Sequence, residues 1–525
     1  MTAPEFPSAP QFPSAPEVLE ADPVLEWHRL DLRMLVVRPL NELLGLIPVL
    51  IGLVVLGGGD TWRIAMSGGV IVLVVAFGLL NWLTTRYRIT DEQVELHTGL
   101  LVRKRLAVPR DRIRTVDLTA KLGHRLFGLS AIRVGTGQHE KAGESGAVTL
   151  DAVSSHEAER LRQLLLDRAP ARAIAAGAEP EADAPVRETS TSIAAFDPRW
   201  LRFAPLTLSG LVAVGGTFGV LMNYAQDFDL RRSAFSGLHD VVEWVTNAPL
   251  ATTIAVLLGV VLVLATIASL LVYVVQFWGY RLTREDDGTL RVRRGLLTTR
   301  SVSVDEDRLR GVEVQEPLLL RLGRGARATA VATGLGTKGE SSLLLPPAPI
   351  SEAHRVAHEV LHVPESPTTS PLRKHPLVAL RRRIVRAVLP VLVLAGVLAV
   401  VAPSWTWQAA LALLPFAALL GWDRYRALGH ALTDRYLVTR SGSALRETVA
   451  LQRSGIIGWR VSQSFFQRRA GLATVSATTA AGDGVYHVID VDAETGLLLA
   501  DEAVPDLLTP FLVRDGQEPS SVDTA

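Results

Sequence analysis

Apolar residues gather in three pairs of long segments along this chain. The pairs are 39–58 with 64–84, 203–224 with 250–277, and 384–402 with 405–422. Each segment approaches the roughly 20 apolar residues that an α-helix needs to cross about 30 Å of hydrocarbon. The chain is therefore predicted to form three transmembrane helical hairpins. The last segment has the shortest apolar run, and Pro415 lies inside it.

After each pair the pattern changes to an alternation of polar and apolar residues, which is typical of short β-strands. In the first such region, strands are predicted over the segments 87–98, 100–108, 130–137 and 147–153. Residues 154–166 then predict an amphipathic helix that begins with a capping box of Ser154 and Glu157. The second and third regions end in similar helical patterns, over 350–362 and 494–512.

The three alternating regions are copies of one repeat. They begin at Tyr87, Tyr280 and His430, and a threonine follows three positions later in each copy, at Thr90, Thr283 and Thr433. The first and third copies share their spacing to a turn glycine, an arginine and a second glycine, which are Gly99, Arg125 and Gly128, and Gly442, Arg468 and Gly471. The middle copy has three extra residues before Gly295 and one more before Gly325. We expect these glycines to adopt backbone conformations that strain other residues.

The repeat resembles a known family in two stretches. These are the YRIT sequence at 87–90, followed by a turn glycine, and QSFFQRRAGLATV at 463–475. Both are similar to the bacterial membrane-flanked PH-like domain family, in its YdbT type with three tandem copies. The resemblance implies transmembrane hairpins that alternate with three small PH-like β-barrel domains, each closed by a C-terminal helix. It implies no enzymatic activity and no cofactor.

These patterns divide the chain into ten predicted parts. Tails are expected at 1–33 and 515–525, and linkers rich in Ala, Pro, Glu and Ser are expected at 169–198 and 363–380. The predicted hairpins span 34–85, 199–278 and 381–423, and the predicted domains span 86–168, 279–362 and 424–514.

Composition supports a membrane protein and excludes several classes of site. The 525 residues are 48% hydrophobic, which is high for a soluble protein. The chain has no cysteine, so disulfides and thiolate metal sites are excluded. A net charge of +1 gives no sign of a nucleic-acid partner, and no sequence motif identifies a small-molecule substrate.

Arginine placement predicts the orientation in the membrane. The loops inside the hairpins carry only Arg63, Arg231 and Arg232, whereas many arginines flank the hairpins, among them Arg33, Arg38, Arg86, Arg88, Arg199, Arg202, Arg281, Arg284, Arg381, Arg382, Arg383, Arg424 and Arg426. Because positive charge stays on the cytoplasmic side, both termini and all three domains are predicted to face the cytoplasm of a bacterium, at its inner membrane.

Residues 358–362 read HEVLH, which matches a zinc motif with two histidines one helical turn apart and a glutamate as the base. Against this hypothesis, Pro364 ends the helix, the first repeat lacks the motif, and no glutamate lies between Glu365 and Glu447 to act as a third ligand. We therefore favour an ordinary solvated helix face and expect no bound metal.

Basic residues near the predicted strand turns are candidate contacts for lipids or partners. They are Arg103, Lys104, Arg105, Arg293, Arg294, Arg300, Arg440, Arg446 and Arg468. Held close to anionic headgroups, each basic side chain contributes about 1 kcal/mol to membrane binding. The alternative is ordinary positive charge beside a membrane.

Together these features favour a non-enzymatic membrane scaffold that presents three PH-like modules. Its expected partners are membrane lipids and either a smaller membrane-flanked PH-like protein or further copies of itself, and a role in envelope maintenance or stress defence is one expectation. A six-span transporter component is the alternative, and a zinc peptidase is a weaker one. Transport pathways usually need ionisable groups near the bilayer midplane, and here Glu42 and Asp423 lie towards the ends of the segments.

Overall fold

The structure is a computed structural model. It describes residues 27–35, 37, 68–69, 72, 76, 79–80, 82–90, 92–98, 104–109, 113, 115–135, 148–166, 190–227, 247–334, 342–505 and 507–508. Most of the predicted first hairpin, Gly99 and Arg103 lie outside these residues.

Each domain consists of two three-stranded meanders followed by a helix. The four strand segments predicted in the first domain are found among these strands, with 87–98 divided in two, but the strand at 115–120 was not predicted. A short helix precedes the second strand of the second meander. In the first domain the elements are β2 (Arg86–Ile89), β3 (Gln93–Thr98), β4 (Lys104–Pro109), β5 (Thr115–Ala120), α3 (Leu122–Leu126), β6 (Leu129–Gly135), β7 (Val148–Ser154) and α4 (Ser155–Leu166).

The second and third domains repeat this order. The second comprises β9 (Arg281–Arg284), β10 (Thr289–Arg294), β11 (Thr299–Asp305), η4 (Glu306–Arg308), β12 (Leu309–Pro317), α9 (Leu318–Leu322), β13 (Gly325–Ala332), β14 (Leu343–Pro349) and α10 (Ile350–Leu361). The third comprises β15 (Gly429–Leu432), β16 (Tyr436–Gly442), β17 (Leu445–Gln452), η7 (Arg453–Gly455), β18 (Ile456–Ser462), α14 (Phe465–Arg469), β19 (Leu472–Thr479), β20 (Val485–Asp492) and α15 (Ala493–Ala503).

The two meanders of a domain pack face to face, and the closing helix covers their core. In the first domain, Val94 of one meander and Ile132 of the other lie in the same buried cluster as Leu161 of α4. Alternation places such residues on one face of each strand, and burial of that face stabilises the sandwich. The predicted helices of the first and second domains are found as α4 and α10, whereas the third ends at Ala503, before the predicted end at 512.

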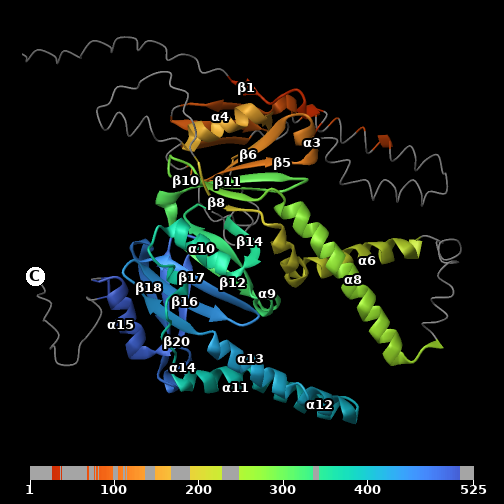
Figure 1. Cartoon of the computed structure of the whole chain (residues 1–525), viewed down its shortest axis with the longest axis vertical. Helices are drawn as coiled ribbons and strands as arrows, with labels where there is room; N and C mark the ends of the chain where they lie inside the picture. The colour runs from red at the N-terminus through yellow and green to blue at the C-terminus, as the bar shows by residue number, and fades with distance from the viewer. Residues whose placement is uncertain are drawn as a thin grey trace, which may run out of the picture.

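The domains share their sheets, so the prediction of three separately closed barrels is not confirmed. Strand β5 of the first domain pairs with β11 of the second, within a seven-stranded sheet in the order β7-β6-β5-β11-β10-β9-β8. Strand β12 of the second domain likewise pairs with β17 of the third, in the order β14-β13-β12-β17-β16-β15. Figure 1 shows the result as one row of domains, coloured from orange through green to blue.

The two shared junctions have the same register. Thr115 pairs with Val304 at the first, and Gly311 pairs with Leu451 at the second. Thr115 and Gly311 hold the same place in their repeats, and so do Val304 and Leu451. Each repeat is therefore joined to the next by the same antiparallel pairing.

Three segments expected to be tail or linker belong to the domains. Strand β1 (His28–Arg29) pairs with β2, and Leu30 is buried in the first core. Strand β8 (Thr191–Ala195) adds an edge to the shared sheet. Within 363–380, the side chain of His375 is buried against the third domain. These segments carry apolar or aromatic side chains that the sheets can bury, which composition alone did not show.

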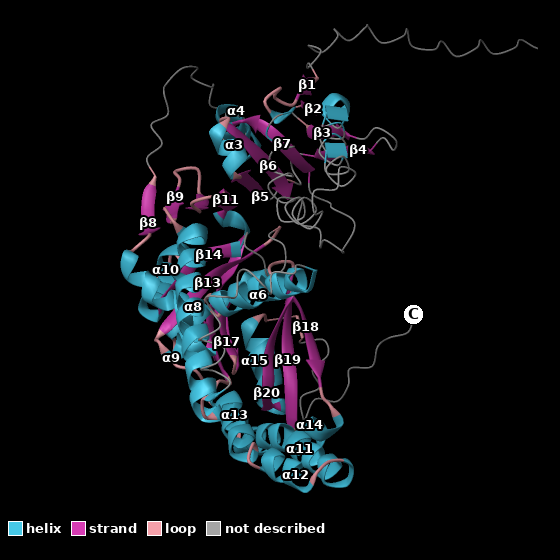
Figure 2. Cartoon of the chain, turned by 90° about the vertical axis from the view of Figure 1, so that its right-hand side faces the viewer, coloured by secondary structure: helices cyan, strands magenta, loops and turns pink. Residues whose placement is uncertain are grey.

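The described residues include three helices long and apolar enough to cross a membrane, or four spans if a bent pair is counted as one. They are α8 (Leu250–Phe277), α11 (Leu377–Val401) and the stretch formed by α12 (Ser404–Leu411) and α13 (Leu414–Arg426). The bent pair joins η2 (Pro198–Thr207) to the start of α6 (Ser209–Asp227) at 56°. These helices leave the row of domains on one side, to the right in Figure 1, and Figure 2 views the molecule from that side.

The predicted span 203–224 is only partly a membrane-type helix. Its first turns belong to η2, in which Trp200 and Phe203 are buried in the core of the second domain. Leu208 then has a positive φ of 59°, which ends η2 before α6 begins. The aromatic residues of η2 therefore anchor the hairpin in the domain.

In the middle repeat, the residue equivalent to Gly128 and Gly471 lies one position before the glycine chosen from the sequence spacing. Gly128 and Gly471 have φ values of 68° and 65° and follow α3 and α14, and the residue in this place after α9 is Arg324, with φ 57°. Gly325 instead lies in β13, where an added Cβ would strike Phe203. The assignment of Gly325 as the equivalent glycine was therefore wrong. The turn glycines Gly295 and Gly442 do match, with φ values of 110° and 97°.

Candidate interaction surfaces

An arginine at the same position in all three repeats connects the first domain to the second and the second to the third. With the corrected alignment, Arg125, Arg321 and Arg468 all stand three residues before the residue of positive φ. The Arg125 guanidinium donates to the carbonyl oxygen of Leu296, and the Arg321 Nη1 donates to the carbonyl oxygen of Ser443 at 3.3 Å.

Both acceptors directly follow the turn glycine of the next domain, at Gly295 and Gly442. The middle repeat therefore does carry this arginine, which the uncorrected spacing had hidden. Arg468 occupies the same place in the third domain, which is the last of the chain, and it is exposed.

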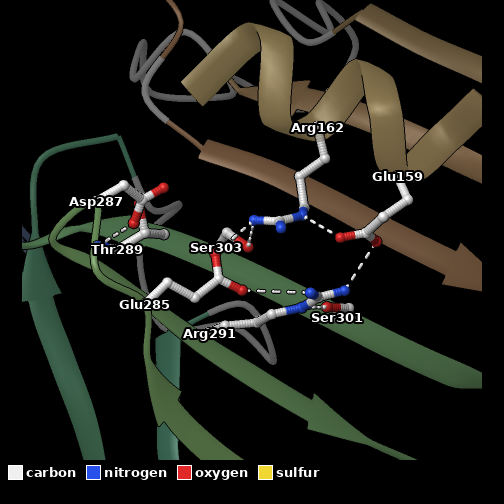
Figure 3. A network of polar contacts seen from close by, with 8 residues as sticks. All are labelled: Glu159, Arg162, Glu285, Asp287, Thr289, Arg291, Ser301 and Ser303. Carbon is white, nitrogen blue, oxygen red and sulfur yellow. Dashed lines mark hydrogen bonds and ion pairs between the residues drawn. The ribbon is translucent and has the colours of Figure 1, made fainter. Parts of the chain in front are cut away.

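A charged network closes the junction between the first two domains (Figure 3). Arg162 of α4 is buried, and its Nε and Nη1 atoms lie 2.8 Å from Glu159 and 2.9 Å from Glu285. Arg291 of β10 contacts the same two carboxylates, at 2.9 Å and 3.3 Å. Burial opposes ionisation of Glu159, but Arg291 and Arg162 outweigh it and hold the pKa of that carboxyl below its usual value. Two residues from each domain thus form a closed ring of alternating charge.

A buried aspartate attaches the third hairpin to its domain. Asp490 of β20 is fully buried and accepts contacts from Arg382 and Arg383 of α11, with Arg383 Nε at 2.7 Å. Gln467 of α14 also donates to it at 2.8 Å. Sequence reasoning used these arginines only for orientation and missed Asp490, because its partners stand over 100 positions earlier in the chain.

Two buried histidines lie beside this anchor. The ring nitrogens His375 Nε2 and His430 Nδ1 are 3.1 Å apart, and His375 Nδ1 lies 3.1 Å from the carbonyl oxygen of Asp490. Burial, with the nearby His375 and Arg373, lowers the pKa of His430 to about 4. Both rings are therefore neutral at physiological pH, and the chain leading into the third hairpin is held by hydrogen bonds.

The short helices α3, α9 and α14 each present large apolar side chains to solvent. These exposed residues are Leu122 and Leu126, Leu318 and Leu322, and Phe465 and Phe466. Each helix lies against the chain that enters a hairpin. Arg33 donates to Phe127 at the end of α3, the side chain of Leu206 of η2 lies close to Gly323 at the end of α9, and Arg382 contacts Ser464 at the start of α14. Exposed apolar residues beside a membrane helix are suited to the headgroup region.

The predicted basic contact residues fall into two groups in the structure. Arg105, Arg293 and Arg468 are exposed. Arg294 is buried over the ring of Phe277, whereas Arg300, Arg440 and Arg446 are half-buried. Lys104 lies in β4. The exposed group is open to solvent. In the other group, Arg300 and Arg446 lie in junction strands, whereas Arg294 stacks on Phe277 of α8 and Arg440 donates to the carbonyl oxygen of Ala427.

The HEVLH sequence lies at the end of α10. Glu359 of the motif is bound by Arg355 at 2.6 Å, and His362 lies outside the helix with φ 50° and faces Glu306 at 3.4 Å. In the described part of the chain, no group of three His, Cys, Asp or Glu side chains could hold a metal ion. The geometry therefore gives these side chains contacts within the second domain.

Comparison with known proteins agrees with this architecture. A family model described as bacterial PH domain matches residues 38–169, 235–363 and 384–500. The chain belongs to the bacterial PH domain family. Its three matches correspond to the three repeats, so the family resemblance found in the sequence is confirmed.

A relative of this family member is known from Bacillus subtilis (strain 168). The UPF0699 transmembrane protein YdbT is 23% identical over 422 residues, which cover 78% of this chain and 83% of the relative. No solved structure matches the chain. The family and the apolar helices together indicate a membrane-associated PH-domain protein.

Proposed function

We propose that this protein is a non-enzymatic scaffold of the bacterial inner membrane, with its three PH-like domains in the cytoplasm. The observation that carries the proposal is the sharing of sheets at β5 with β11 and at β12 with β17. Backbone hydrogen bonds across these junctions make one stiff row from three domains, and the row holds its hairpins at set positions. A stiff row of domains positions partner proteins or lipids through its surface, and this role requires no catalytic site.

The row also has a surface suited to a membrane. The exposed apolar residues of α3, α9 and α14 lie beside the hairpin entrances, and the exposed Arg468 and Arg469 share α14 with Phe465 and Phe466. Aromatic rings enter the headgroup region while arginines meet lipid phosphates. Anionic lipid headgroups are therefore the ligands we propose for this surface, and another PH-like chain is the proposed protein partner.

The contacts of Asp423, near the end of the last span, favour a role in attaching the hairpin to the domains over a role in transport. Its Oδ2 accepts from Arg321 at 2.9 Å and from Ser443 at 2.8 Å. The carboxylate thus joins the hairpin to the junction between the second and third domains, where its charge is already matched.

Reporter fusions test the orientation on which the scaffold depends. Fusions after Leu166, Val360 and Val513 are expected to report cytoplasm, and a fusion at Ser236 is expected to report the outside. A periplasmic signal from any of the first three would overturn the proposed scaffold and its lipid contacts at the inner leaflet.

A further inference from the structure

The row of domains ends in two strand edges that no described strand covers. Strand β18 is the outer strand of the sheet β18-β19-β20, and β4 is the outer strand of the sheet β1-β2-β3-β4. In the repeat, β18 holds the place of β5 and β12, and β4 holds the place of β11 and β17. One chain therefore carries both halves of a further junction, one at each end.

Side chains on both edges are uncovered where the internal junctions are closed. Val461 of β18 is 43% exposed, whereas its equivalent Val314 is 0% exposed beneath β17. Ala107 of β4 is exposed, whereas its equivalents Ser303 and Ala450 are fully buried. The exposed edges thus lack the cover that the repeat provides elsewhere.

The side chain of Arg468 indicates a missing neighbouring domain independently of the strand edges. Arg125 and Arg321 reach the turn of the following domain, at Leu296 and Ser443. Arg468 is exposed, and no described residue accepts from its guanidinium as Leu296 and Ser443 do from those of its equivalents. Leu100, directly after Gly99, holds the sequence position of these two acceptors in the first domain and lies outside the described residues.

We propose that β18 of one copy pairs antiparallel with β4 of a second copy, in the register of the internal junctions. This inference rests on the proposed scaffold, because it requires the first and third domains of neighbouring copies on the same side of the membrane. Such a head-to-tail contact joins different surfaces of the two copies, so it produces rows or rings of chains.

The register follows from the two junctions already described. Thr119 pairs with Arg300, and Gln315 pairs with Glu447, so the equivalent new pair is Ser462 with Lys104 of the second copy. The neighbouring pairs place Val461 opposite Arg105 and Arg460 opposite Leu106. In these three pairs no two like charges stand directly opposite each other, so the register avoids that source of destabilisation.

Cysteine cross-linking in native membranes tests this register, and the chain has no cysteine of its own. Two differently tagged full-length copies are co-expressed, one with Ser462→Cys and the other with Lys104→Cys, and treated with a short bis-maleimide. We expect a covalent heterodimer. A single chain with Thr119→Cys and Arg300→Cys calibrates the reaction, because this pair has the same repeat position within one molecule.

The matched control replaces Lys104→Cys with Arg105→Cys, which lies on the opposite face of β4. We expect its heterodimer yield to be about tenfold lower. Arg468→Ala is also expected to lower the yield about tenfold, since it removes a charge-assisted hydrogen bond equivalent to those of Arg125 and Arg321. Arg435→Ala, at an exposed position in the turn before β16, is expected to leave the yield unchanged.

Three outcomes would overturn the proposal. They are no heterodimer where the Thr119 and Arg300 calibrator reacts fully, equal yields from Lys104→Cys and Arg105→Cys, and links between two Ser462→Cys copies in place of the heterodimer. Membrane fractionation and the reporter at Val513 are measured on the same cells. A chain that stays in the membrane with cytoplasmic domains, yet fails to cross-link, leaves the scaffold standing without head-to-tail pairing.

Discussion

The two internal junctions share one backbone register but differ in side-chain chemistry. At the first, the core of domain one is separate from the core of domain two, and charged residues around Arg162 bridge them. At the second, the core of domain two continues into domain three through Tyr436, Val438 and Ala450. Backbone pairing therefore sets the geometry of both, while side chains decide how each responds to salt, pH and truncation.

The largest effect is expected from breaking the charged network. Arg162→Ala removes two charge-assisted hydrogen bonds and leaves Arg291 as the remaining cation beside Glu159 and Glu285, so it should destabilise the first junction by about 3 kcal/mol. Hydrogen–deuterium exchange of the β5 and β11 peptides in nanodiscs would measure this loss. Arg160→Ala, on the exposed side of α4, serves as the control and should change exchange little. Equal effects of the two variants would contradict a structural role for the network.

The pH dependence of the first junction should trace to Asp117 on β5. Burial raises the pKa of Asp117 to about 6, against the lowering effect of Arg300. Since the folded state binds this proton more tightly, the contribution of Asp117 to stability is fully present below about pH 4, is lost as the pH rises from 4 to about 6, and stays constant above that.

Replacement of this carboxyl by an amide removes the cost of ionisation. Asp117→Asn should therefore stabilise the junction by about 2–3 kcal/mol at pH 7.5 and have no effect below pH 4. Exchange of the β5 peptide, corrected for its intrinsic pH dependence, would measure the difference. A variant that is less stable than the parent at pH 7.5 would show that neighbouring arginines outweigh burial.

The stability of the second junction should fall when a cavity is made in its core and should not depend on salt. Val438 is fully buried in the core shared by domains two and three, so Val438→Ala should cost about 2 kcal/mol. Exchange of the β16 and β17 peptides should rise equally at low and high ionic strength. At the first junction, added salt should weaken only the partly exposed contact of Arg291 with Glu159, which are 20% and 35% exposed, because the buried Arg162 is screened much less. Similar salt dependence at both junctions would remove the distinction drawn between them.

A smaller effect is expected at the turn after the short helices. Arg324 shows that a non-glycine residue adopts φ 57° there, and an added Cβ on Gly471 would meet no atom within 4 Å. Gly471→Val should therefore cost about 1.5 kcal/mol through backbone strain, and Gly471→Arg should cost less. Limited proteolysis of the third domain would rank the two variants. A reversed ranking would mean that Arg324 is not the equivalent of Gly471.

Much of this architecture was readable from local pattern. Runs of apolar residues predicted the helices α8 and α11, and alternation predicted most strands of each domain. The repeat was visible because each copy keeps residues that its own backbone needs, such as Gly442 at φ 97°. The alignment of the middle repeat was one residue off because Arg324, and not a glycine, adopts the positive φ that Gly128 and Gly471 adopt in the other copies.

Local pattern therefore determined the apolar helices, the closing helices and most strands of each repeat, but it missed β1, β5 and β8. The tertiary structure decided which strand edges meet, because backbone hydrogen bonds are the same for any pair of antiparallel strands and carry no sequence label. It also decided the roles of Asp490 and Arg162. Asp490 meets Arg382 and Arg383, and Arg162 meets Glu285, across more than 100 positions of the chain, so these charges became neighbours only in the folded chain.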